Sequence, residues 1–131
     1  GDARTSFSYE NANSPNAPEW SPVNFYTRLF GCEVLHEQEG GWFVLLRLSD
    51  NELGFMKPNR PSQAAIFRPA FEGRGVWVAI EVEDAGAEYE RLRALGVPIE
   101  VQLRDEPWGD RHFVVVDPNG IGVDVVQRVG T

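Results

Sequence analysis

One segment in the first half of the chain has the start, face and end signals of a helix. Ser21 can cap the helix and Pro22 suits its first position, because the first N–H groups of a helix have no partner inside it. Gly31 can end it. Three large apolar residues at helical spacing share one face: Tyr26, Leu29 and Phe30. The pattern therefore predicts a helix between Ser21 and Gly31.

A second helix is predicted in the other half of the chain. Asp84 can cap this helix and Gly96 can end it. Glu88 and Glu90 fall in the early turns, where the helix dipole favours negative charge. An apolar stripe runs along one side: Ala85, Leu92 and Leu95.

Strand-like runs follow each predicted helix. They cover residues 32–38, 41–48 and 52–57, then 98–104, 111–117 and 121–128. The nearly continuous apolar run Val76–Val82 predicts a strand before the second helix, and Thr5–Tyr9 predicts a weaker one before the first. Residues 10–18, rich in Asn, Pro and Ala, indicate an extended loop. The chain thus repeats one plan of strand, helix and three strands: a first module at about residues 5–57, a linker at about 58–74 and a second module at about 75–128.

The last two strands are joined by the turn sequence Asp-Pro-Asn-Gly. Pro118 presets one backbone φ angle, and Gly120 permits a positive one. This combination predicts a hairpin that closes the chain.

Composition narrows the class of protein. A chain of 131 residues that is 42% hydrophobic fits one globular domain, residues 1–131. The net charge of −8 repels phosphate backbones, so we expect no nucleic acid partner, whereas a neutral or cationic small ligand is accommodated more easily. We also expect a cytoplasmic protein without a membrane span, since no apolar run is long enough. The single cysteine, Cys32, excludes an internal disulfide; we expect it to pack in the core, although a reactive thiol is the alternative.

The closing hairpin resembles that of a known superfamily. Trp108-Gly109, Arg111 and Phe113, followed by Asp117-Pro118-Asn119-Gly120 and a strand with one carboxylate, are similar to the last hairpin of the glyoxalase, bleomycin-resistance and extradiol-dioxygenase superfamily, also called vicinal oxygen chelate proteins. Residues 25–31, 82–84 and 92–97 resemble its two helix signatures. The resemblance covers nearly the whole chain and implies an α+β fold: two βαβββ modules form a curved mixed sheet around a groove, with the helices on the outer face.

Metal-dependent members of this superfamily take ligands, usually His, Gln or Glu, from the first and last strands of each module. The last of the four positions holds Asp124, an oxygen donor one methylene shorter than the usual glutamate. The third holds Val76-Trp77, the second holds Gly54, and the first falls within residues 7–9. One donor in four positions is a poor site for a divalent ion, so we expect no metal and no cofactor.

Two further residue types bear on this expectation. A shift of strand register would bring Glu52 to the second ligand position, so a weak metal site formed by Glu52 and Asp124 stays an alternative. The two histidines, His36 and His112, fall in strands that do not ordinarily carry ligands in the superfamily. We expect them to be surface residues or hydrogen-bonded structural residues.

Large aromatic side chains occupy the positions expected around the groove. We predict a ligand-binding set, with no catalytic residue assigned: Trp42, Phe55, Trp77, Trp108, Arg111, Phe113 and Asp124. Strand alternation also favours packing of Phe55 and Phe113 under the helices. Arg111 can bind a ligand oxygen or pair with Asp110, Asp124 or Glu106. Asp124 can attract a basic ligand, act as a general base, or be a solvated or Arg-paired carboxylate.

The resemblance and these residues together favour a metal-free small-molecule binding protein similar to bleomycin-resistance proteins, with no assigned chemistry. In that branch ligands bind between two subunits, so we expect a homodimer. The alternative is a metal-dependent lyase, isomerase or dioxygenase acting on a vicinal-oxygen substrate, so whether the chain is an enzyme stays undecided. A third possibility is a domain whose groove is filled by its own side chains.

Overall fold

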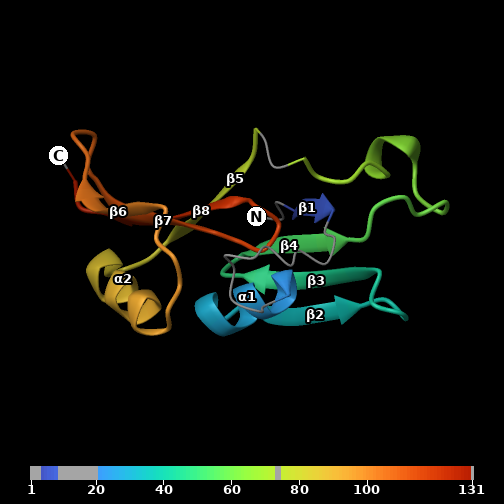
Figure 1. Cartoon of the computed structure of the whole chain (residues 1–131), viewed down its shortest axis with the longest axis horizontal. Coiled ribbons are helices and arrows are strands. Elements are labelled where there is room, and N and C mark those ends of the chain that lie inside the picture. The colour runs from blue at the N-terminus through green and yellow to red at the C-terminus, as the bar shows by residue number, and fades with distance from the viewer. Residues whose placement is uncertain (1–3, 9–20, 73–74, 131) are drawn as a thin grey trace. The chain divides into compact units, whose positions relative to one another are not determined.

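The computed structural model describes residues 4–8, 21–72 and 75–130, which fall into two compact units. Each unit carries its own four-stranded mixed sheet and its own α-helix, labelled in Figure 1. The loop predicted at residues 10–18 lies outside the described residues, as does Tyr9.

The first unit contains four strands, one α-helix and a short 3₁₀ helix, in this order: β1 (Arg4–Ser8), α1 (Pro22–Phe30), β2 (Glu33–Glu37), β3 (Phe43–Leu48), β4 (Asn51–Met56) and η1 (Ala65–Phe67). Its strands lie in the order β1-β4-β3-β2. β1 is parallel to β4, and the other neighbours are antiparallel.

The second unit repeats the plan with five elements: β5 (Trp77–Glu81), α2 (Ala85–Ala94), β6 (Val101–Asp105), β7 (Asp110–Val116) and β8 (Gly122–Arg128). Its strands lie in the order β5-β8-β7-β6, with β5 parallel to β8. The predicted α+β class and the repeated strand-helix-strand-strand-strand plan are confirmed. The strand predicted from residue 98 begins later, at Val101, and its pairing with β7 is irregular between Val101 and Arg104.

The caps of both helices are the predicted ones. The Ser21 hydroxyl accepts a hydrogen bond from the Asn24 N–H at 3.1 Å, and the Asp84 carboxylate accepts one from Ala87 N–H at 3.0 Å. Gly31 follows α1 with a φ of 65°, the left-handed conformation that glycine adopts without strain. One residue of the predicted α2 stripe does not fit, because Leu95 follows the helix as its C-cap and is 53% exposed.

An aromatic pair joins the helix to the sheet in each unit. Phe55 of β4 packs against Tyr26 of α1, with ring centroids 5.3 Å apart, and Phe113 of β7 meets Tyr89 of α2 at 5.2 Å. Both phenylalanines are completely buried. Their assignment to the ligand-binding set is therefore corrected: alternate residues of a strand point to opposite faces, and these two point under the helices.

The Asp-Pro-Asn-Gly turn closes the β7–β8 hairpin as predicted. Gly120 has a φ of 81°, and its N–H donates to the Asp117 carbonyl at 2.9 Å. The buried Asp117 carboxylate accepts hydrogen bonds from the N–H groups of Asn119 at 2.8 Å and Ile121 at 2.9 Å. These bonds replace the solvation that the carboxylate loses on burial, so Asp117 is a structural residue of the turn.

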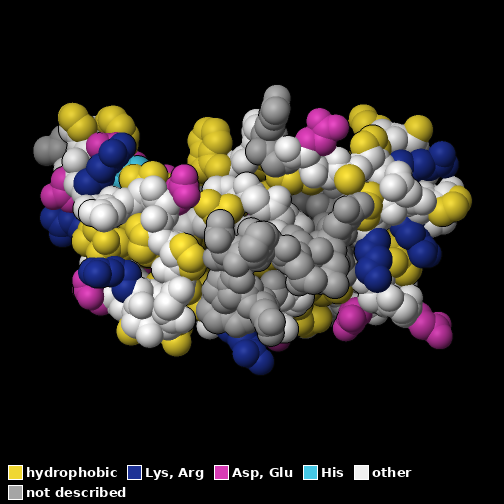
Figure 2. All heavy atoms as spheres, in the orientation of Figure 1, with side chains coloured by type: hydrophobic (Ala, Val, Ile, Leu, Met, Phe, Trp, Pro, Cys, Tyr) yellow, Lys and Arg dark blue, Asp and Glu magenta, His cyan; other side chains and the backbone are white. Residues whose placement is uncertain are grey.

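The described part of the linker, residues 58–72, is tied to itself by Arg68. Its side chain donates to the carbonyls of Gln63 at 2.7 Å and Pro61 at 3.1 Å. The adjacent η1 exposes Ile66 and Phe67, and hydrophobic side chains show over this segment in Figure 2. Among the helices described here, none has the length and apolar character that a bilayer span requires.

Candidate functional site

The second sheet has one face covered by α2 and another that α2 does not cover, which we call the helix-free face. Val123 and Val125 of β8 are buried on the α2 side. Asp124 lies between them and therefore points to the helix-free face. The side chains that pair with this position across the sheet, Ala79 of β5 and Val114 of β7, share that face.

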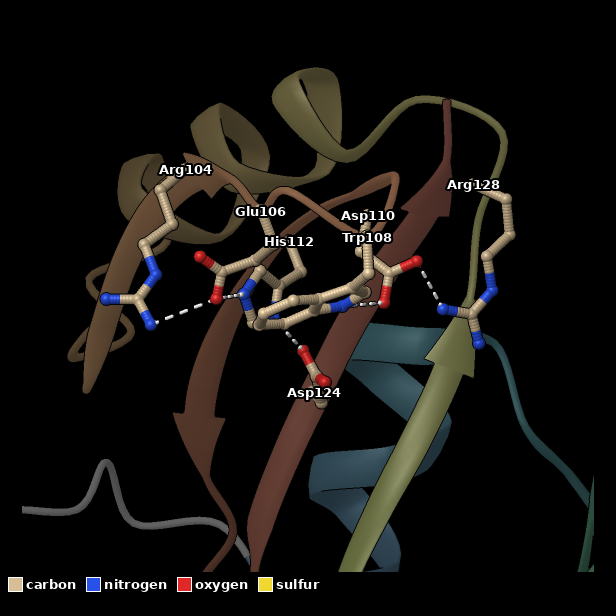
Figure 3. Close-up of polar contacts among 7 residues, drawn as sticks. All are labelled: Arg104, Glu106, Trp108, Asp110, His112, Asp124 and Arg128. Carbon is tan, nitrogen blue, oxygen red and sulfur yellow. Dashed lines mark hydrogen bonds and ion pairs between the residues drawn. The ribbon is translucent and has the colours of Figure 1, made fainter. Parts of the chain in front are cut away.

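His112 of β7 lies between two carboxylates on the helix-free face (Figure 3). Its Nδ1 is 2.7 Å from an oxygen of Asp124, and its Nε2 is 3.3 Å from an oxygen of Glu106. The side chains of His112 and Glu106 are each only 12% exposed, and that of Asp124 is 25% exposed. Both ring nitrogens are engaged, so the imidazole has a fixed orientation.

The two carboxylates favour the protonated form of His112. Burial lowers the pKa of His112, but the hydrogen bonds and negative charges of Asp124 and Glu106 together outweigh this effect. The pKa of His112 therefore lies above its ordinary value. Near neutral pH the ring carries more positive charge than an exposed histidine would.

Two arginines complete this cluster of charges. Arg104 of β6 pairs with Glu106 at 3.1 Å, and Arg128 of β8 pairs with Asp110 of β7 at 2.6 Å. The pKa of Asp110 is lowered, chiefly by the hydrogen bond from Arg128. Asp110 also accepts a hydrogen bond from the indole N–H of Trp108 at 2.9 Å. Figure 3 shows these contacts side by side at the β6–β7 turn.

Two indole rings of the second unit are widely exposed. Trp77 of β5 is 70% exposed and Trp108 of the β6–β7 turn is 63% exposed. Trp77 pairs with Gly122, two residues before Asp124, so Trp77 and Asp124 share the helix-free face. Gly122 has no side chain to cover the neighbouring Trp77 ring.

The remaining predicted ligand-binding residues lie elsewhere. Arg111 donates to both carboxylate oxygens of Asp105, at 2.7 and 3.1 Å, so its partner is not one of the three that we considered from the sequence. Arg111 neighbours His112 along β7 and therefore points to the other face, away from Asp124. Trp42 belongs to the first unit, where the Arg60 guanidinium lies 4.7 Å from the centre of its ring.

His112, Glu106 and Arg128 belong to the site although the sequence pattern did not predict them there. The register of the hairpin contains a usable signal. With Val116 paired to Gly122, His112 pairs with Val126 and lies diagonally across from Asp124 on the same face. Glu106 gave no such signal, because it comes from the turn rather than from a paired strand.

The residues around Asp124 do not fit a divalent metal ion. The strand neighbour of Asp124 is Ala79, whose side chain has no donor atom, and Trp77 pairs with Gly122, two residues before Asp124, where neither side chain can bind a metal. His112, the nearest nitrogen donor, already has a carboxylate at each ring nitrogen. Within residues 4–8, 21–72 and 75–130, no three His, Cys, Asp or Glu side chains are placed to hold an ion together. Cys32 is buried, which raises the pKa of its thiol to about 11.

Comparison with known proteins identifies the family. The model of the Glyoxalase/Bleomycin resistance protein/Dioxygenase superfamily matches residues 22–125. An uncharacterized protein of Mycobacterium tuberculosis is 27% identical over 106 residues, 76% of this chain and 62% of its own length. The bleomycin resistance protein of Geobacillus stearothermophilus is 22% identical over 116 residues, 82% of this chain and 86% of that protein.

Solved structures share the fold. TioX from Micromonospora sp. ML1 matches with a TM-score of 0.74 and 21% identity over 98% of each chain. Lactoylglutathione lyase from Agrobacterium tumefaciens matches with a TM-score of 0.73 and 22% identity, over 95% of this chain and 90% of the other. TnmS3, an antibiotic binding protein from Streptomyces sp. CB03234, matches with a TM-score of 0.65 and 21% identity, over 96% of this chain and 95% of the other. The expectation drawn from the closing hairpin is thereby confirmed, and this chain belongs to the glyoxalase/bleomycin resistance protein/dioxygenase superfamily.

Proposed function

We propose that this chain is a metal-free small-molecule binding protein that holds its ligand on the helix-free face of the second sheet. The observation that carries the proposal is the pair of exposed indole rings, Trp77 and Trp108, on the unit that also holds the carboxylates of Glu106, Asp110 and Asp124. Large exposed rings beside oriented polar groups are typical of sites for planar ligands.

The two rings offer substantial contact energy. A tryptophan side chain buries roughly 150–250 Å² when it is fully covered. Covering the exposed part of one such ring therefore contributes roughly 3 kcal/mol at about 25 cal/mol per Å². The two rings lie toward opposite ends of β8, about 20 Å apart along the strand, because Trp77 pairs with Gly122 and Trp108 is held by Asp110, which pairs with Arg128. An extended ligand that covers both rings gains roughly 6 kcal/mol, and its polar contacts must supply the rest of the about 8.2 kcal/mol that micromolar binding requires.

The charges favour a ligand that carries a positive group. The chain has a net charge of −8, so a positively charged ligand approaches in a favourable field. A cationic group attached to a planar ring would gain from the negative field and from the electron-rich ring faces.

The names of two similar proteins point the same way. One relative is a bleomycin resistance protein, and one structural match is an antibiotic binding protein. The superfamily also includes lyases, but the alternative of a metal-dependent enzyme is not favoured here, because Trp77 and Gly54, at two of the four expected ligand positions, offer no donor atom for a metal.

Titration calorimetry with metal-free bleomycin and with a panel of planar cationic antibiotics tests this function. We expect saturable micromolar binding of at least one compound, weakened tenfold or more by Trp77→Ala and by Trp108→Ala. Phe67→Ala is the matched control, since Phe67 is an aromatic residue that is 58% exposed on the linker. Stabilisation by a divalent metal with no response to any compound would favour the enzyme instead.

We further propose that the protein is a homodimer, as expected from its resemblance to the bleomycin-resistance branch. Light scattering at micromolar concentration measures the mass directly. A mass near twice 14.7 kDa supports the dimer, and a mass of one chain refutes it.

A further inference from the structure

The ring of Trp108 is exposed to solvent and yet held in one orientation. Its indole N–H donates to Asp110 at 2.9 Å. The turn itself does not depend on this contact, because three backbone hydrogen bonds already close it: Glu106 N–H to Asp110 carbonyl, Gly109 N–H to Glu106 carbonyl and Val129 N–H to Gly109 carbonyl. The side-chain bond therefore fixes the ring rather than the backbone.

The acceptor of that bond is itself anchored. Asp110 and Arg128 are directly opposite each other in the β7–β8 pairing, and the guanidinium donates to the second carboxylate oxygen at 2.6 Å. The Asp110 side chain is only 17% exposed. One oxygen holds Trp108 and the other is held by β8, so the ring is connected through Asp110 to the sheet (Figure 3).

We infer that Asp110 is a positioning residue, held by Arg128, that fixes the Trp108 ring as a preformed platform on which the ligand binds by its flat face. The inference rests on the proposed function and deepens it. Asp110 acts through Trp108 and is not expected to touch the ligand.

The arrangement restricts the chemical class of the ligand. The only hydrogen-bond donor of an indole ring is its N–H, and here that donor is used within the chain. Trp108 therefore offers only its ring faces, which suit a planar aromatic or planar cationic group. A compound that must accept a hydrogen bond from an indole gains nothing at this position.

A fixed ring also improves affinity. A free side chain loses rotational freedom when a ligand orders it, and that loss reduces the observed affinity. Trp108 has already lost this freedom in the unbound chain. Releasing it by Asp110→Ala should weaken ligand binding about two- to tenfold.

The first arm of the experiment needs no ligand. In the full chain with ¹⁵N-labelled tryptophan, we expect the Trp108 indole N–H of the wild type to be as rigid as the backbone, with a clear loss of order in Asp110→Ala. Asp110→Asn, whose amide oxygen can still accept the bond, should largely restore it. Asp105→Ala is the matched control, because Asp105 lies on the same sheet and pairs with Arg111 instead. Equal order of the ring in wild type and in both Asp110 variants overturns the inference.

The second arm is a double-mutant cycle measured with metal-free bleomycin or the best compound of the panel. Trp108→Phe keeps a ring face but has no N–H, so Asp110→Ala should cost two- to tenfold in wild type and nothing more in the Trp108→Phe background. An equal loss in both backgrounds would show that Asp110 acts elsewhere and overturns the inference. If no compound binds the wild type, the proposed function fails while the first arm still decides the role of Asp110.

Discussion

Replacing Asp124 by asparagine tests whether the charged hydrogen bond between His112 of β7 and Asp124 of β8 stabilises the fold. The amide oxygen of Asp124→Asn can still accept a bond from His112, but the negative charge 2.7 Å from the ring nitrogen is lost. A hydrogen bond to a charged partner contributes about 1.5–3 kcal/mol and a neutral one about 0.5–1.5. Because the two side chains are only 12% and 25% exposed, we expect the free energy of unfolding to fall by about 1–1.5 kcal/mol at pH 5.5.

This loss should depend on pH in a definite direction. The pKa of His112 is raised in the folded chain, so the stability it contributes is fully present below the unfolded value of about 6.5 and is lost as the pH rises through the folded pKa. The difference between wild type and Asp124→Asn should therefore be largest at pH 5.5 and clearly smaller at pH 9.

Urea unfolding followed by fluorescence at pH 5.5, 7 and 9 measures this difference. Asp105→Asn is the control: its partner Arg111 stays protonated throughout, so the effect of that variant should not change with pH. A difference for Asp124→Asn that is constant or grows toward pH 9 refutes the reasoning about His112.

Three further predictions concern residues with structural roles. Asp117→Ala should lower the free energy of unfolding by about 2–4 kcal/mol in urea, since it removes the buried acceptor of two backbone N–H groups; a change below measurement error would contradict this role. Phe113→Ala should lower the free energy of unfolding in urea by about 3–5 kcal/mol, because Phe113 is buried, and Trp108→Ala should lower it by less than about 0.5 kcal/mol, because Trp108 is exposed. Equal losses for the two variants would contradict the assignment of Phe113 to the core and of Trp108 to the surface. Cys32 should react with iodoacetamide at pH 8 far more slowly in the native chain than in urea, because its thiol is buried with a pKa of about 11; rapid native labelling would show otherwise.

The elements of the fold could be predicted because they depend on local signals. The caps at Ser21 and Asp84 and the turn glycine Gly120 each act through a conformation or hydrogen bond within a few residues. The resemblance to the superfamily then ordered these elements into two modules. Such local signals can be recognised in the sequence without any knowledge of tertiary contacts.

The site was harder to predict because its contacts depend on sheet faces and on a turn. Phe55 and Phe113 are aromatic like Trp77 and Trp108, and only the face of the strand separates core from exposed residues. The partner of Arg111 was misjudged for the same reason: Asp105 shares its face and Asp124 does not. Glu106 reaches His112 from a turn, whose path no alternation pattern specifies.

The most direct test of the central claim is a titration of the ¹⁵N-tryptophan-labelled chain with metal-free bleomycin and the antibiotic panel, followed through the indole N–H signals. We predict that at least one compound shifts the Trp77 and Trp108 signals together, with one saturable dissociation constant, while added divalent metal shifts neither. Saturable binding that leaves both signals unchanged, or an absence of binding across the whole panel, would contradict a small-molecule site on the helix-free face.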